Sequence, residues 1–442
     1  MNVPGATKHR TLTLFPLVGA LYFMVSGGPY GLEELAHKLG FGAAIVVLLV
    51  TPVIWSLPTA LMVGELAAAL PEEGGYYAWV RRALGPFWGY QEAWLSLTAS
   101  VFDMAIYPAL FVLYLHRIAP SLSSPLLVGV LVIAAAAACN LGGARAVGRE
   151  SVVMTALLVA PFVVLSGLAL CRHPSAPAIA KSEAAASPDF VGGVLVAMWN
   201  YMGWDNASTV AGEVDRPQRT YPLAVFSSVG LIALTYVVPF LAMWIAGVDP
   251  QDWDTGSWAD VARHFGGQPL AVAVVVGGML SAFGMASALC LSYSRLPAVL
   301  AADGYLPRFL ARRSPKSQTP WVSVIACSIA WIVALQWSFE RLLGMDILLY
   351  GFSLLLEFAA LVVLRVREPA LARPFRIPGG LIVVVALGLG PLALLGLALV
   401  QNAREAIGDF NSLGLGLGLV LLGPVAYVAG RGTRRLEHRP MG

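Results

Sequence analysis

Charge is what this sequence has least of: charged residues make up 12% of the 442 positions, and hydrophobic residues make up 58%. Ordinary globular domains carry about 25% charged residues. A soluble protein of this length could not cover its surface with so few charges, and the mean hydropathy of +0.75 agrees. The composition therefore excludes a soluble globular protein and indicates a chain embedded in a lipid bilayer.

Cysteine and histidine are also too sparse for metal or thiol chemistry. No two cysteines have a metal-binding or redox spacing, the six histidines are dispersed, and no HExxH motif is present. The four cysteines lie in or beside apolar segments and are expected to be small buried hydrophobes: Cys139, Cys171, Cys290 and Cys327. We expect no metal, no cofactor and no disulfide framework. A membrane enzyme is disfavoured, because the clustered residues that it needs are missing.

Long apolar segments dominate the chain. A spanning helix needs about 20 mostly apolar residues. Twelve segments qualify: 11–39, 41–69, 86–115, 122–142, 149–171, 190–212, 222–247, 266–301, 319–338, 344–365, 379–401 and 411–430. The alternation of β-barrel strands is absent, and an open sheet would leave backbone groups unpaired in lipid. The sequence predicts an all-α integral membrane protein with twelve transmembrane helices, joined by loops too short for a soluble domain.

Basic residues are distributed unevenly between the two sets of connections. With an even number of helices both termini share a side, and that side collects most of the 28 lysines and arginines. The positive-inside rule then predicts cytoplasmic termini for a multi-pass protein of the cell membrane. Lys8 and Arg10 before the first segment resemble a signal peptide, but the run lacks a small-residue cleavage site, so a first spanning helix is expected.

Two segments contain interruptions that a regular helix cannot hold. They are Ser26-Gly27-Gly28-Pro29-Tyr30-Gly31 in the first segment and Asn200-Tyr201-Met202-Gly203-Trp204-Asp205 in the sixth. Segments five apart cross the membrane in opposite directions, as two inverted five-helix repeats require. The alternative is a pair of simple kinks. The predicted organisation is a first repeat over 1–171, a second over 190–365, two further helices over 379–430 and a tail over 431–442.

Acidic residues inside these segments indicate function, because a charge in a membrane is costly. Asp103 precedes Tyr107 by four residues, so both side chains point the same way. Asp205 closes the second interruption. No lysine or arginine is expected in a span core to neutralise them. A cavity lined by such acids suits a cationic solute, a proton, or both.

Three further acids have a structural interpretation beside the functional one. Glu33 and Glu34 start the half-helix after the first interruption, where the helix dipole favours an anion, and one of them is expected to cap it. Glu357 lies near the cytoplasmic end of its segment and near Arg365. Its carboxylate is expected to be satisfied by backbone N–H groups at a helix end.

Aromatic residues gather near the interruptions: Tyr22, Tyr30, Tyr107, Trp199, Tyr201 and Trp204. An aromatic face stabilises a desolvated ammonium group by up to about 2 kcal/mol. Any single one of them is more often a packing or interfacial residue. Trp199 and Trp204 flank the second interruption and are therefore the better candidates for contact with a solute.

Five motifs in order resemble those of the amino acid–polyamine–organocation transporter superfamily. They are Pro71-Glu72-Glu73-Gly74-Gly75-Tyr76 with Leu84-Gly85-Pro86, Ala211-Gly212-Glu213-Val214, Arg219-Thr220-Tyr221-Pro222, Ser294-Arg295 with Asp303-Gly304-Tyr305-Leu306-Pro307, and Arg373-Pro374-Phe375-Arg376-Ile377-Pro378. The closer resemblance is to plant-type polyamine uptake transporters. It is carried by 25–34, by Phe102-Asp103-Met104-Ala105-Ile106-Tyr107-Pro108, and by Trp199-Asn200, Trp204-Asp205-Asn206 and Ser208-Thr209.

This resemblance implies a proton-coupled carrier of polyamines or amino acids with the LeuT-type 5+5 inverted repeat and broken helices 1 and 6. The chain departs from the plant type at Met202 and Gly203. An acid at the position of Asp205 is common across the superfamily, so it does not by itself indicate polyamines. Some proton-coupled relatives carry a lysine in the fifth segment, but residues 151–171 hold no charge. A proton site must therefore lie elsewhere.

Our hypothesis is a proton-driven symporter that imports cationic amines. The candidate substrate-binding residues are Ser26, Gly27, Gly28, Tyr30, Asp103, Tyr107, Trp199, Asn200, Gly203, Trp204 and Asp205, and the candidate proton carriers are Glu34, Asp103 and Asp205.

The alternative is an amino acid permease, in which the substrate carboxylate meets N–H groups at residues 26–28. Ser281 and Ser287 are candidate ligands for a coupled sodium ion. A non-transporting sensor is a remote third hypothesis. No nucleic-acid partner is expected.

Overall fold

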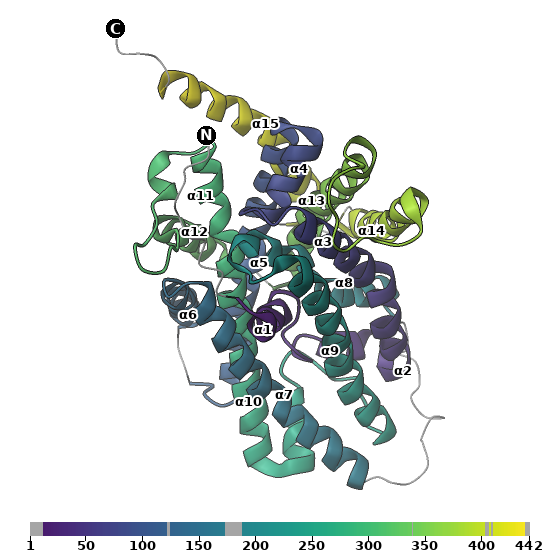
Figure 1. The fold of residues 1–442 in the computed structure, drawn as a ribbon. Helices are drawn as coiled ribbons and strands as arrows, with labels where there is room; N and C mark the ends of the chain where they lie inside the picture. The colour runs from purple at the N-terminus through teal and green to yellow at the C-terminus, as the bar shows by residue number, and fades with distance from the viewer. Residues whose placement is uncertain are drawn as a thin grey trace.

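The computed structural model describes residues 12–121, 124–172, 188–337, 339–402, 406–407 and 410–437, and helices make up almost all of it (Figure 1). The first half of the described chain comprises α1 Leu14–Val25, α2 Glu33–Thr51, the π-helix η1 Pro52–Ser56, α3 Leu57–Ala69, α4 Gly75–Leu84, α5 Pro86–His116, α6 Pro125–Asn140, α7 Ala144–Arg172 and α8 Phe190–Trp199.

The second half comprises the 3₁₀-helix η2 Trp204–Glu213, α9 Pro217–Ile245, α10 Trp258–Tyr293, α11 Arg295–Ala302, the 3₁₀-helix η3 Arg308–Ala311, α12 Trp321–Ala334, α13 Phe339–Arg367, α14 Gly380–Asn402 and α15 Ser412–Glu437. A two-residue antiparallel ladder pairs β1 Ala406–Ile407 with β2 Phe410–Asn411, and Ala406 lies opposite Asn411.

Eight helical stretches of the described chain are long and apolar enough to cross a membrane. Their outer faces carry large apolar side chains, such as Ile382 at 84% exposed and Leu421 at 69% exposed. Exposed aliphatic side chains on long helices are what lipid contact requires. The protein is therefore a multi-pass membrane protein, as its composition predicts.

Two connections expected to be loops contain helices. The amphipathic helix α4 follows α3, and α10 begins at Trp258, within the connection 249–265. Gly267 has a φ of +71° and separates this short first part of α10 from the long second part. Gly40, with a φ of +70°, divides α2 in the same way. That division agrees with the predicted boundary between the first and second segments.

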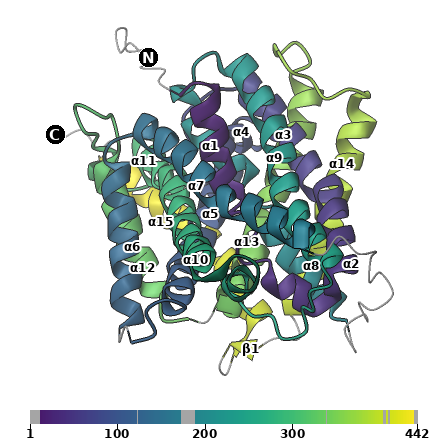
Figure 2. The same cartoon turned by 90° about the horizontal axis from the view of Figure 1, so that it is seen from below.

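The two interrupted segments lie in the middle of the bundle. In Figure 2, α1 lies among α7, α9 and α10, whereas α14 lies at the periphery. The long helix α5 packs against both α10 and α13. The unwound residues between α1 and α2, and between α8 and η2, are thereby enclosed by helices that lie far apart in the sequence.

The two interruptions touch each other through their backbones. Gly203 has a φ of +93°, and a Cβ at this position would lie 2.2 Å from the carbonyl oxygen of Met24, at the end of α1. Only glycine adopts this conformation and permits this approach without strain. The glycine therefore allows the second break to pack directly against the first.

A buried ion pair joins α3 to α13. Arg365 donates to both carboxylate oxygens of Glu65 at 2.8 and 2.5 Å, and the backbone N–H of Ile377 donates to the same carboxylate at 2.8 Å. The Nε atom of Arg373 lies 3.2 Å from Oε1 of Glu65. Neither Glu65 nor a buried cation was expected inside the spans. Arg365 is committed to Glu65 and is not a partner of Glu357.

At the same end of the bundle, α4 is tied to the residue after α13. Arg82 donates to both carboxylate oxygens of Glu368, at 3.0 and 2.7 Å. These bonds favour the ionised form and hold the pKa of Glu368 below its usual range. The pair is partly exposed, so it adds little to stability, but it fixes where α4 lies.

Replacing Gly203 by alanine should destabilise the protein, because the new methyl group meets the Met24 carbonyl and the positive φ disfavours a side chain. We expect a loss of at least about 1–2 kcal/mol, measured as a lower unfolding temperature in detergent. Gly212→Ala is the matched control, since its Cβ would meet nothing within 4 Å. Equal unfolding temperatures for the two variants would contradict the backbone contact.

Breaking the buried pair with Arg365→Met should lower the unfolding temperature strongly, because a buried carboxylate left without its main partner costs about 3–5 kcal/mol. Lys38→Met is the control. It removes a pair to Asp189 whose side chains are 31% and 48% exposed, and such pairs contribute at most about 1 kcal/mol. A small and equal effect of both substitutions would show that the buried pair is dispensable.

Candidate solute-binding site

A cavity of about 290 Å³ lies where the two broken segments meet α5, α10 and α13. Its lining residues are Met24, Val25, Asp103, Tyr107, Trp199, Met202, Gly203, Asn206, Met285, Leu289, Tyr293, Asp346 and Tyr350. The two breaks and three long helices therefore build one site together.

Two carboxylates face this cavity, and no lysine or arginine is among the described residues that line it. Asp103 is 4% exposed and accepts hydrogen bonds from Tyr107 and, at 3.0 Å, from Tyr293. Asp346 is 2% exposed, and its carboxylate has no hydrogen-bond partner among the described residues. A buried carboxylate without a partner is strongly unfavourable. The arrangement therefore favours a ligand that brings positive charge.

Aromatic and apolar side chains form most of the rest of the lining. The rings of Tyr107 and Trp199 stack with their centroids 6.3 Å apart and their planes inclined by 22°. Methionine and leucine side chains from α1, α10 and the second break complete the lining. Such walls suit methylene groups, and the ring faces suit an ammonium group. Two carboxylates in an otherwise aromatic and apolar lining suit a short alkyl chain that carries amines.

Asp205 lies behind the cavity and does not line it. It is 2% exposed and accepts a hydrogen bond from the hydroxyl of Tyr350. The Tyr350 oxygen in turn accepts the backbone N–H of Gly203 at 3.1 Å. Through Tyr350, Asp205 ties the second break to α13. In this arrangement Asp205 positions Tyr350 and Gly203, and its contact with a solute stays a prediction.

Of the predicted substrate-binding residues, Asp103, Tyr107, Trp199 and Gly203 line the cavity. The others lie at the two breaks and bond to the surrounding protein. At the first break, Ser26 accepts from the N–H of Gly28 at 3.0 Å, Ser281 donates to the carbonyl of Gly27 at 2.6 Å, and Tyr30 donates to the carbonyl of Val274 at 2.8 Å. At the second break, Tyr236 donates to the carbonyl of Asn200 at 2.6 Å, and Trp204 is fully buried.

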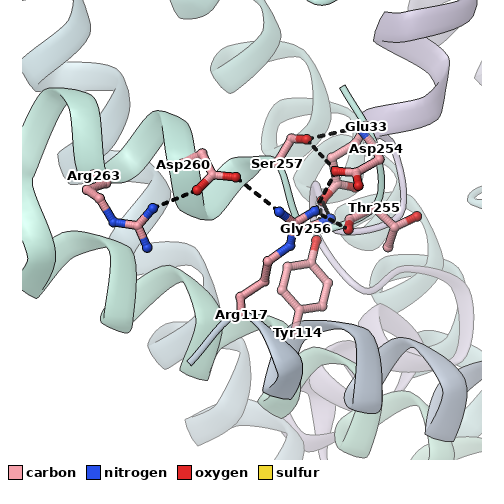
Figure 3. A network of polar contacts seen from close by, with 9 residues as sticks. All are labelled: Glu33, Tyr114, Arg117, Asp254, Thr255, Gly256, Ser257, Asp260 and Arg263. Carbon is pink, nitrogen blue, oxygen red and sulfur yellow. Dashed lines mark hydrogen bonds and ion pairs between the residues drawn. The ribbon is translucent and has the colours of Figure 1, made fainter. Parts of the chain in front are cut away.

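Figure 3 shows the surroundings of Glu33, the first residue of the half-helix after the first break. Its buried carboxylate accepts hydrogen bonds from Tyr114, from the N–H of Gly31 at 2.7 Å and from the N–H of Gly256 at 3.0 Å. Arg117 then binds Asp254 at 2.5 Å and Asp260 at 3.1 Å. These bonds hold the connection that precedes α10 against the start of the half-helix.

Two other predictions concern residues that the cavity does not include. Glu34 is half-buried and lies outside the lining. Ser281 contacts the first break, whereas Ser287 lies six positions later, about 240° around a helix of 3.6 residues per turn. The two hydroxyl groups therefore do not share a face of α10, and a sodium site with both as ligands stays a prediction.

Asp346 is the residue that the sequence analysis missed. It lies inside the predicted segment 344–365 and precedes Tyr350 by four residues, the same acid–tyrosine spacing that singled out Asp103 and Tyr107. Applying that criterion to every segment would have found it. The sequence analysis also overlooked Glu65 and Glu92, although both are acidic residues within predicted spans.

Comparison with known proteins agrees with a transporter. The amino acid permease family model matches residues 18–415. The chain is 34% identical to polyamine transporter RMV1 of Arabidopsis thaliana over 94% of its own length and 86% of the relative's. It is 35% identical to polyamine transporter PUT1 of Oryza sativa subsp. japonica over 94% and 78%. A probable polyamine transporter of Arabidopsis thaliana is 36% identical over 89% and 83%.

The family match covers most of the chain, and it extends across both broken segments and all the helices that line the cavity. The resemblance inferred from the motifs is thereby confirmed. The chain belongs to the amino acid permease family of the amino acid–polyamine–organocation superfamily, and it is a membrane transporter rather than an enzyme.

Proposed function

We propose that this protein imports polyamines or related cationic amines across the cell membrane, driven by protons. The observation that carries the proposal is the pair Asp103 and Asp346, which face one aromatic cavity whose described lining contains no lysine or arginine. The relatives named as polyamine transporters support the same class of solute. Each carboxylate would bind one ammonium group, and the rings of Tyr107 and Trp199 would flank the methylene chain.

An amino acid is the second candidate, because the matching family is described as amino acid permease. Its carboxylate would need free N–H groups at the first break. Gly28 already donates to Ser26, and Gly31 already donates to Glu33. A substrate carboxylate would also be repelled by Asp103 and Asp346. These contacts favour a solute that carries amines alone.

The proposed architecture is twelve spans with the LeuT-type 5+5 inverted repeat. Four of the predicted spans are not among the eight long apolar helices. Two of them are broken, and the other two, α6 and α12, have only 16 and 14 residues. With α1 plus the start of α2 as the first span and α8 plus η2 as the sixth, the number becomes twelve. The repeats would be 1–171 and 190–365, and spans 1, 2, 6 and 7 would rock against the rest.

We further propose that both termini are cytoplasmic. Basic residues concentrate at the end of the bundle that holds α4, α11 and η3. Arg81 pairs there with Asp303, and Arg313 pairs with Glu73 at 2.6 Å. Positive charge beside short connections is expected on the cytoplasmic side.

Asp346→Asn should reduce uptake of radiolabelled putrescine into proteoliposomes with an inward proton gradient by about 10-fold or more. A hydrogen bond to a charged group contributes about 1.5–3 kcal/mol, and 1.4 kcal/mol is a factor of ten. Asp252→Asn is the control, because Asp252 is exposed and lies outside the cavity. It should transport normally.

A matched pair of solutes sharpens this test. Putrescine and butylamine differ in one ammonium group, so the variant should lose the preference for putrescine that the wild type shows in competition. Uptake of arginine or a neutral amino acid without putrescine uptake would replace the polyamine proposal by the amino acid one. Absence of any flux would point to a sensor.

A further inference from the structure

A second group of buried acids lies outside the solute cavity, between α5 and α13. Glu92 on α5 and Glu357 on α13 are both fully buried, and neither lines the cavity. The hydroxyl of Ser353, one turn before Glu357, donates to Glu92. Ser96 also donates to Glu92, at 3.1 Å, and lies 3.0 Å from Ser353. The two helices therefore meet at this group.

Within the part of the chain that the structure describes, the charge of Glu357 is not balanced by a bond. Both of its carboxylate oxygens lack a hydrogen-bond partner among the described residues, and so does Oε2 of Glu92. The titratable groups that face Glu357 are Glu92, Asp205, Tyr76 of α4 and Tyr350. Each of them is an acid or a phenol. Arg365, two turns further along α13, is held by Glu65.

Two ionised carboxylates cannot share such a place. Burying one unpaired carboxylate is already very costly, and such groups take up a proton instead. The nearby carboxylates of Asp205 and Glu92 add repulsion, so ionising all of these acids together is unfavourable and favours a proton on the group. A group that binds and releases one proton inside a carrier is what coupling to a proton gradient requires.

The two helices also connect this pair to the solute cavity. Residues three or four apart on a helix share a face, and both helices carry one polar face: Glu92, Ser96, Asp103 and Tyr107 on α5, and Asp346, Tyr350, Ser353 and Glu357 on α13. One end of each face lines the cavity, and the other end holds the buried pair. Asp205, bonded to Tyr350, lies near both ends.

We propose that Glu92 and Glu357 form the site that carries the coupling proton, separate from the solute cavity and linked to it through Asp205 and Tyr350. The proton adds to a carboxylate oxygen of the pair, gives a neutral carboxyl group, and leaves from that same oxygen when the carrier faces the cytoplasm. This inference rests on the proposed proton-driven transport. It places the proton away from Glu34, Asp103 and Asp205, the candidates of the sequence analysis.

Glu357→Gln should separate the proton from the solute, because glutamine keeps the shape of the side chain but cannot titrate. Two assays in proteoliposomes measure this: exchange of labelled putrescine at equal pH on both sides, and accumulation driven by an inward proton gradient. We expect exchange within about 2-fold of the wild type, since the cavity is untouched. Stimulation by the gradient should fall to about 1-fold. Asp346→Asn should lose both activities.

Gradient stimulation that persists in both Glu357→Gln and Glu92→Gln would overturn the proposal. So would accumulation that follows a sodium gradient and is lost in these variants, because the pair would then bind sodium. Loss of exchange together with accumulation in Glu357→Gln, in a variant with the wild-type unfolding temperature, would place Glu357 in solute binding and would also overturn it.

If transport by the wild type does not respond to a proton gradient, the proposed proton coupling is refuted. Whether Glu92 and Glu357 hold a proton can still be tested by an experiment that does not measure transport. Dicyclohexylcarbodiimide adds only to protonated carboxyl groups in apolar surroundings. Mass spectrometry should find it on Glu357 or Glu92 at neutral pH, with less labelling as the pH rises and none in the double glutamine variant. Absence of label on both residues would show that neither holds a proton.

Discussion

Every backbone group that a helix break frees inside a membrane must find its partner within the protein. The two breaks of this transporter meet that demand in different ways. At the first break, Ser26 and Glu33 accept backbone N–H groups, and Ser281 donates to a carbonyl. At the second, Gly203 donates to Tyr350 and packs against the carbonyl of Met24. The cavity exists because these contacts hold the unwound segments apart from lipid and against each other.

The same two helices, α5 and α13, carry acids at two levels of the bundle. Asp103 and Asp346 face the cavity, and Glu92 and Glu357 lie beyond it. The nearby buried Arg365 is committed to Glu65, so it supplies no positive charge to either level. External cations of two kinds, an ammonium group and a proton, would satisfy the two levels. In the proposed mechanism Asp205, which accepts a hydrogen bond from Tyr350 at the cavity, links the two levels.

The spanning segments and both interruptions were predictable because their signals are local. A run of apolar residues or a Gly-Pro cluster has its effect wherever the chain is placed. Asp103, Tyr107 and Trp199 were found for a similar reason, since a helical spacing or a position beside a break is visible in the chain. The helices at 75–84 and 258–266 were missed because they are short and only partly apolar.

The sequence by itself determined that this chain lies in a membrane, where its helices break, and that acids lie within its spans. Only the tertiary structure decided which acid has which partner. Glu33 is bonded to Gly256 and Glu65 is bonded to Arg365, over separations of 223 and 300 residues. Asp346 faces the cavity, whereas Glu357, three turns later, is buried outside it, one turn beyond the Ser353 that bonds Glu92. A side chain's neighbours on other helices depend on how those helices pack, and no local pattern records that packing.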